Sequence, residues 1–262
     1  MNTPVPAPFG TRTARVMFTA LFGELALYPT RHDPARQQDA FSLFYGRSMD
    51  LGLLTDERLE RSGLWGMNDA AAGEAAAGEA AGPPPRVAWF QVALTGNGLA
   101  PVVPFLAVAD AVITRLGRLR LDAIQVLLPE RTKDDRSQVD DSWFADLDPA
   151  LRVPVRVTLD SADAAITTAA PAIMRDQQVL FPYQDAFRCD SLSLSDEDHL
   201  VLRPIPFEHP GDVHHRVTFT GTLAEWSLDA LGWLATLLDH AASRQDITSP
   251  LVLTADTPEN AA

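Results

Sequence analysis

The sequence predicts an α+β fold built from two related halves. Two stretches carry this prediction, residues 86–129 and residues 215–255, because each is typical of a strand with Arg-Val near its start, a helix and a second apolar strand. The segment between them supplies a further strand and helix. We therefore expect two β-α-β containing, ferredoxin-like units, with helices on one face of a mostly antiparallel sheet.

The N-terminal region is expected to add a strand at 14–22 and a helix near 34–49. Asp33 is suited to the N-cap and Pro34 to the first helical position. Apolar residues at helical spacing support this helix, and they are Phe41, Phe44 and Tyr45. The pattern also indicates a short helix at 56–62.

Residues 68–85 are predicted to be a linker or a long surface loop. This stretch is rich in alanine, glycine, glutamate and proline and has no large apolar residue after Asn68. It divides the chain into an N-terminal strand–helix segment, residues 1–67, and a main α+β domain, residues 86–262.

The main domain is read as alternating strands and helices. Thr222 and Glu225 have the spacing of a capping box before the last helix, in which Trp226 and Trp233 share a face. Helices are expected at 101–117, at 162–175 and after 223. Strands are expected at 86–94, 121–129, 152–159, 187–194, 199–205, 215–223 and 250–255.

Charge and composition exclude some partners and favour others. The formal net charge is −14, with no basic stripe, so neither nucleic acid nor an anionic membrane is expected as a partner. A basic protein partner is electrostatically easier. The chain has one cysteine, no signal-peptide pattern and no run of ~18 apolar residues, which indicates a cytoplasmic protein without a membrane span.

The turn at Gly96, Asn97 and Gly98 follows a predicted strand and opens a predicted helix. A phosphate-binding loop occupies such a position, so these residues are the candidate nucleotide site. The match to the dinucleotide fingerprint is incomplete, because Pro101 stands where the third glycine belongs. A simple tight turn is the preferred interpretation, and no cofactor is expected.

His209, Asp212 and His215 are the best candidates for acid–base catalysis, which needs only one histidine and one carboxylate. The surrounding His, Asp and Glu residues could also hold a metal ion. Their spacing matches no metal motif, and His214 and His215 would point to opposite faces of a strand. No metal site is therefore predicted. Cys189 is expected to be a buried structural thiol.

No compact catalytic set is evident, so the preferred hypothesis is a non-catalytic binding or assembly protein. It would engage a protein partner or a second copy through its sheet, an edge strand or the acidic loop 130–148, where Trp143 and Phe144 resemble a docking segment. One alternative is an enzyme or carrier with an apolar pocket for a small molecule and a His/Asp pair. The other is nucleotide binding at Gly96–Gly98.

Overall fold

The structure is a computed structural model, and it describes residues 15–29, 39–54, 65–73, 84–94, 100–130, 151–180, 187–194 and 215–258. Within these ranges the chain forms an eight-stranded sheet and four helices. In chain order they are β1 (Arg15–Leu27), α1 (Ala40–Asp50), β2 (Trp65–Ala72), β3 (Arg86–Leu94), α2 (Val102–Leu116), β4 (Gly117–Leu128), β5 (Val153–Ser161), α3 (Ala165–Leu180), β6 (Phe187–Leu194), β7 (His215–Leu223), α4 (Leu228–Arg244) and β8 (Leu251–Asp256).

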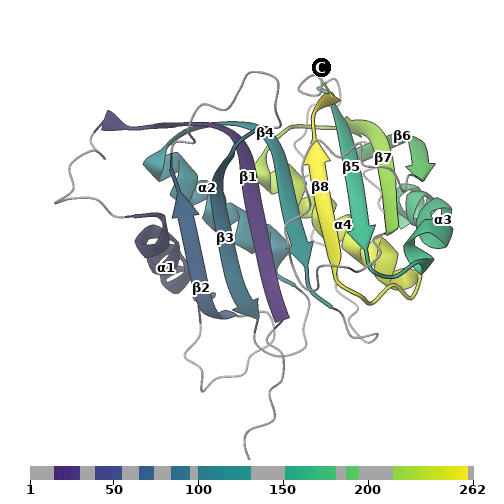
Figure 1. Cartoon of the computed structure of the whole chain (residues 1–262), viewed down its shortest axis with the longest axis horizontal. Coiled ribbons are helices and arrows are strands. Elements are labelled where there is room, and N and C mark those ends of the chain that lie inside the picture. Colours follow the sequence, from purple (N-terminus) through teal and green to yellow (C-terminus); the bar gives the residue numbers. More distant parts are fainter. Residues whose placement is uncertain are drawn as a thin grey trace, which may run out of the picture.

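The sheet has the strand order β2-β3-β1-β4-β8-β5-β7-β6, and every pairing in it is antiparallel (Figure 1). The predicted class, α+β with an antiparallel sheet, is therefore confirmed. The N-terminal strand β1 lies between β3 and β4, so residues before 68 belong to the same sheet as the predicted main domain.

The same order of elements occurs twice along the chain. Strand, helix, strand, strand, helix, strand runs from β1 to β4 and again from β5 to β8. Within each group of four strands, the fourth strand neighbours the first, and the third lies between the first and the second. The two groups meet where β4 pairs with β8, with Val126 opposite Leu253.

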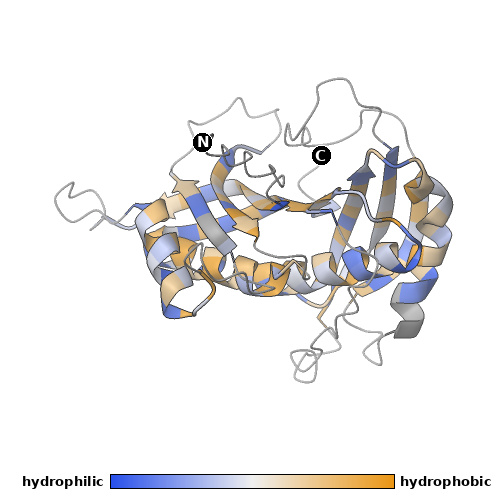
Figure 2. Ribbon diagram, turned by 90° about the horizontal axis from the view of Figure 1, so that it is seen from below, coloured by the Kyte–Doolittle hydropathy of each residue, from blue (hydrophilic) through white to orange (hydrophobic). Residues whose placement is uncertain are grey.

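The four helices gather on one side of the sheet, where they bury the main hydrophobic core (Figure 2). Strand residues on this side alternate with residues on the helix-free face, as β8 illustrates: Leu253 and Ala255 join the core while Thr254 does not. Helices α2 and α4 approach closely at Gly232, where an added Cβ would lie 3.3 Å from the Cα of Val103. None of the described helices is long and apolar enough to cross a membrane.

Helix α1 is anchored by an aromatic cluster. Phe44 is fully buried, and its ring centroid lies 5.1 Å from Phe90 of β3 and 6.0 Å from Phe105 of α2. Trp65, at the start of β2, stacks on Phe44 at 6.4 Å. The cluster fixes α1 over the β2 end of the sheet.

Two expected helix starts differ from the observed ones. The N-cap of α1 is Asp39 and not Asp33, and its carboxylate accepts from Ser42 N at 2.7 Å.

The N-cap of α4 is Ser227, whose Oγ accepts from Ala230 N at 3.1 Å. The predicted capping box is wrong because Thr222 is committed to β7, where it pairs with both β5 and β6. Trp226 therefore precedes α4, and its Nε1 donates to Leu121 O at 2.8 Å.

The stretch predicted as a linker begins as a strand. Residues 68–72 belong to β2 and pair with β3, Ala70 lying opposite Phe90. The expected boundary at residue 68 thus falls inside a strand. The helix expected at 56–62 and the strand expected at 199–205 lie outside the described residues.

Replacing Phe44 is expected to test the aromatic cluster. Phe44→Ala should lower the free energy of unfolding by about 3–5 kcal/mol, because it removes a buried aromatic side chain and leaves a cavity. Phe41→Ala is the matched control on the same helix, since Phe41 is exposed and its loss should change stability by only about 0.5 kcal/mol. Denaturant unfolding of both variants measures the difference, and equal effects would contradict the proposed anchoring.

Candidate interaction surface

The residues predicted to carry chemistry are not assembled in the described part of the chain. Gly96, Asn97 and Gly98, like His209 and Asp212, lie outside the described residues. His215 is the first residue of β7, half-buried and opposite Ser161 of β5. Among the residues that are described, no group of three or more His, Cys, Asp or Glu side chains could hold a metal ion. Trp143 and Phe144 are also outside the described ranges.

Cys189 lies in β6 with its side chain against the main core. It is half-buried rather than fully buried, and its Sγ donates to Ser191 O at 3.3 Å. Burial raises the pKa of this thiol, so it is held in the neutral, unreactive form at neutral pH. A bulge between Cys189 and Ser191 interrupts the regular pairing of β6 with β7.

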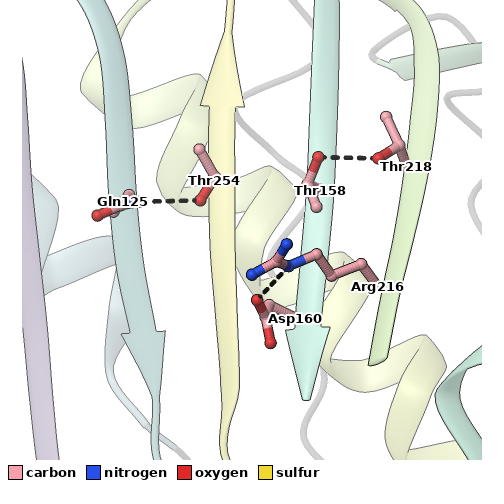
Figure 3. Close-up of polar contacts among 6 residues, drawn as sticks. All are labelled: Gln125, Thr158, Asp160, Arg216, Thr218 and Thr254. Carbon is pink, nitrogen blue, oxygen red and sulfur yellow. Dashed lines mark hydrogen bonds and ion pairs between the residues drawn. The ribbon is translucent and has the colours of Figure 1, made fainter. Parts of the chain in front are cut away.

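The helix-free face of the second half is polar, and its side chains bond across strands (Figure 3). Gln125 of β4 donates to Thr254 of β8 at 3.3 Å. Thr158 of β5 shares a 3.0 Å hydrogen bond with Thr218 of β7. The register puts Thr158 opposite both Thr254 and Thr218, so these residues form one row across four strands. Gln125 is 0% exposed, although no described helix covers this face.

Two ion pairs flank this row. Arg216 Nε lies 2.8 Å from Asp160 Oδ2, and both side chains are largely buried. Arg156 Nη2 lies 2.9 Å from Asp256 Oδ1 on the other side of the row. Burial raises the pKa of Asp256, and the guanidinium of Arg156 offsets part of that shift. Each pair joins residues directly opposite in neighbouring strands, so these contacts tie β5 to β7 and β8.

The same face is apolar in the first half of the chain. Phe18 of β1 stacks on Trp89 of β3 with ring centroids 6.0 Å apart. Ala20 and Leu127 are buried beside them in a second, smaller hydrophobic cluster. The helix-free face is therefore divided between an apolar part over β1 and β3 and a polar part over β5 and β7, and the central strands β4 and β8 contribute to both parts.

Exposed apolar side chains concentrate on α1. Phe41 is 41% exposed, Tyr45 46% and Met49 51%, and they recur every four residues. Because residues four apart lie on one side of a helix, the three form a continuous row, which we call the α1 outer row. The rings of Phe41 and Tyr45 are 6.3 Å apart. Leu51, at the C-cap, is also exposed. Single exposed apolar residues are ordinary, whereas a row of three is typical of an interaction site.

Among the described elements, the α1 outer row faces neither the sheet nor α2. The buried row of α1, Ala40, Phe44 and Ser48, faces the sheet. The side of α1 that faces α2 carries Ser42, Leu43, Gly46, Arg47 and Asp50. At 100° per residue, the centre of the outer row lies about 130° around the helix from the centre of this α2-facing side. In Figure 1, α1 lies beside β2 at one end of the molecule, so the row projects beyond the β2 edge of the sheet.

An open groove of about 620 Å³ separates α1 from α2. Its walls carry Ser42, Gly46, Arg47 and Asp50 of α1 and Thr114 and Arg115 of α2. Leu43, Ala111 and Val112 also line it, so the groove is mixed in polarity and open to solvent, unlike the closed apolar pocket that the small-molecule hypothesis requires. His215 does not line it.

Strand β2 forms one edge of the sheet, and part of that edge is already occupied. Trp65 N donates to Leu53 O at 3.0 Å, and Ala70 N donates to the carboxylate of Asp69 at 2.8 Å. Both contacts satisfy backbone groups that a further strand would otherwise use. The α1 outer row, rather than the β2 backbone, is therefore the better candidate for contact with another protein.

Comparisons with known proteins add no further assignment. No family model matches the chain, and no curated protein or solved structure is similar to it.

The sequence contained a signal for the α1 outer row that its periodicity alone did not resolve. Phe41, Phe44 and Tyr45 were used together as apolar residues at helical spacing, but only Phe44 is buried. Residues 40, 44 and 48 form one row along α1, and residues 41, 45 and 49 form the next row. Most residues of both rows are apolar. A helix at the edge of a sheet buries only one such row. A second apolar row on the same helix is therefore the sequence feature that indicates an interface.

The buried ion pair of Asp160 with Arg216 is expected to contribute far more to the free energy of unfolding than an exposed ion pair does. Asp160→Asn should lower the free energy of unfolding by about 3 kcal/mol or more, because it removes one partner of a buried pair. Glu24→Gln is the control: Glu24 and Arg120 are 3.0 Å apart but both largely exposed, and this change should cost at most about 1 kcal/mol. Urea unfolding at neutral pH measures the stability of both variants. Similar losses of stability in the two would contradict the prediction that the buried pair contributes more.

Proposed function

We propose that this protein is a non-catalytic binding or assembly protein that engages a protein partner through the α1 outer row. The observation that carries this proposal is the concentration of partly exposed Phe41, Tyr45 and Met49 on one side of α1. Amphipathic helices recognise partners through apolar residues at this spacing. Aromatic residues and methionine are also the types enriched in protein interfaces.

The size of the row fits a recognition surface. Three large side chains, each about half exposed, present about 200–300 Å² of apolar surface. This approaches the range in which the largest surface patch of a monomer is often functional. The net charge of −14 opposes binding to nucleic acid or to an anionic membrane, which leaves protein as the favoured class of partner.

We also propose that the scaffold consists of two ferredoxin-like units fused edge to edge. The repeated order of strands and helices supports this proposal, as does the repeated arrangement of the strands within each half. The halves would then share one sheet through β4 and β8. In this scaffold α1 is the only described helix at the β2 edge, which is why its outer row is left uncovered.

A paired-variant binding experiment tests the proposed function. Immobilised wild-type protein, incubated with an extract of the cells that produce it, should retain a polypeptide that then binds in purified form. Tyr45→Asp should reduce this binding at least tenfold, because a charge would be buried in the interface. Leu194→Asp is the matched control, since Leu194 is exposed on β6 at the opposite edge of the sheet. Binding that is unaffected by Tyr45→Asp, or the absence of any bound polypeptide, would refute the proposal.

A further inference from the structure

We infer that the groove between α1 and α2 binds an acidic segment of a protein partner, whose carboxylates pair with Arg47 and Arg115. The groove lies on a different side of α1 from the α1 outer row, so this inference goes beyond the proposed function and does not depend on it. Three observations carry it: two arginines on facing walls, the contrast with the second half of the chain, and the apolar base of the groove.

Two guanidinium groups border the groove from facing walls. Arg47 lies in the last turn of α1 and Arg115 in the last turn of α2, and both side chains are exposed. Asp50 is the one acidic side chain among the described residues that line the groove. Within the part of the chain that the structure describes, none of the three forms an ion pair. The groove is therefore a site of local positive charge on a protein whose net charge is −14.

The second half of the chain shows how such an arginine is neutralised. In the repeated order of elements, α3 and α4 correspond to α1 and α2. Arg244, in the last turn of α4, has its Nε 3.4 Å from Oδ2 of Asp176 in α3, and Gln245 donates to the same oxygen at 3.0 Å. The first half has Arg47 and Arg115 in the last turns of its two helices and no such bridge between them. A carboxylate from a partner would supply there what Asp176 supplies between α3 and α4.

The base of the groove is apolar. Leu43 and Val112 pack into the main hydrophobic core and also line the groove together with Ala111. A segment that carries both acidic and apolar side chains can thus place an apolar one on this base while its carboxylates reach the arginines. Small-molecule sites enclose most of the ligand surface, whereas this groove of about 620 Å³ is open to solvent. Its shape therefore favours a segment of polypeptide over a small acid.

The net charge of −14 does not prevent this contact. At an ionic strength of about 0.1 M, charges more than about 10 Å apart on the surface are largely screened from one another. The two nearby guanidinium groups therefore dominate the interaction with a carboxylate in the groove, and arginine binds carboxylates through short, charge-assisted hydrogen bonds. Nucleic acid binding instead draws on roughly 6–10 phosphate contacts, which two arginines cannot supply.

Fluorescence anisotropy with labelled peptides and the purified full chain tests the inference. The probes are short peptides in which glutamate alternates with leucine and alanine, and the same peptides with glutamine in place of glutamate. The glutamate peptides should bind with a Kd below about 1 mM and at least about tenfold more tightly than the glutamine peptides, which lack the charge. Equal binding of the two kinds of peptide, or no binding of either up to about 1 mM, overturns the inference.

Substitution of the arginines locates the site. Arg47→Gln and Arg115→Gln should each weaken binding of the glutamate peptides about three- to tenfold, because each removes one charge-assisted contact. Arg244→Gln is the matched control, since Arg244 lies in the last turn of the corresponding helix and is already paired with Asp176. It should bind the peptides as the wild type does. Binding that survives both groove substitutions, or that falls as much in the control, overturns the assignment.

An acid introduced into the groove gives a result that a folding defect cannot imitate. Arg47→Asp puts a carboxylate across the groove from Arg115, as Asp176 lies across from Arg244. This variant should bind the glutamate peptides at least about tenfold more weakly, while its Tm equals or exceeds that of the wild type, because the new carboxylate pairs with Arg115. Unchanged affinity, or a lowered Tm, would contradict the proposed pairing across the groove. None of these outcomes bears on the α1 outer row, which Tyr45→Asp tests separately.

Discussion

The pairing of β4 with β8 is the contact on which the rest of the structure depends. It joins a strand from the middle of the chain to one from near its end, and without it the two groups of four strands share no sheet hydrogen bonds. Beneath this junction α2 and α4 pack closely because Gly232 leaves room for the backbone of α2. The sheet junction and the helix contact together make one hydrophobic core from both halves.

Polar side chains specify the register at this junction. A slip of one residue between β4 and β8 would turn either Gln125 or Thr254 toward the helices and expose Ile124 or Ala255 in its place. Buried polar groups are costly when they lose their partners. The bond of Gln125 with Thr254 therefore favours one alignment of β4 with β8, as the pair of Asp160 with Arg216 does for β5 with β7. That alignment sets how far the two groups of strands are offset from each other along the strand direction.

Hydrophobic periodicity was sufficient to predict the α+β class and most elements between residues 86 and 255. It failed for β2, because the segment WGMNDAAA has little strand propensity of its own and is held by pairing with β3 and by the burial of Trp65. It also failed to separate the two rows of α1, since burial of one row depends on long-range contacts with Phe90 and Phe105. The sequence thus predicted binding to a protein partner, but it did not predict which surface would bind.

The central position of β8 has a consequence for synthesis on the ribosome. β4 is complete at Leu128, but its partner begins at Leu251. At about 5–20 residues per second, the nascent chain keeps this apolar strand edge open for roughly 6–25 seconds. An unpaired strand containing Ile124, Val126 and Leu128 is a template for aggregation during that interval. Chaperone protection of the growing polypeptide is therefore expected to matter most before its final strand emerges.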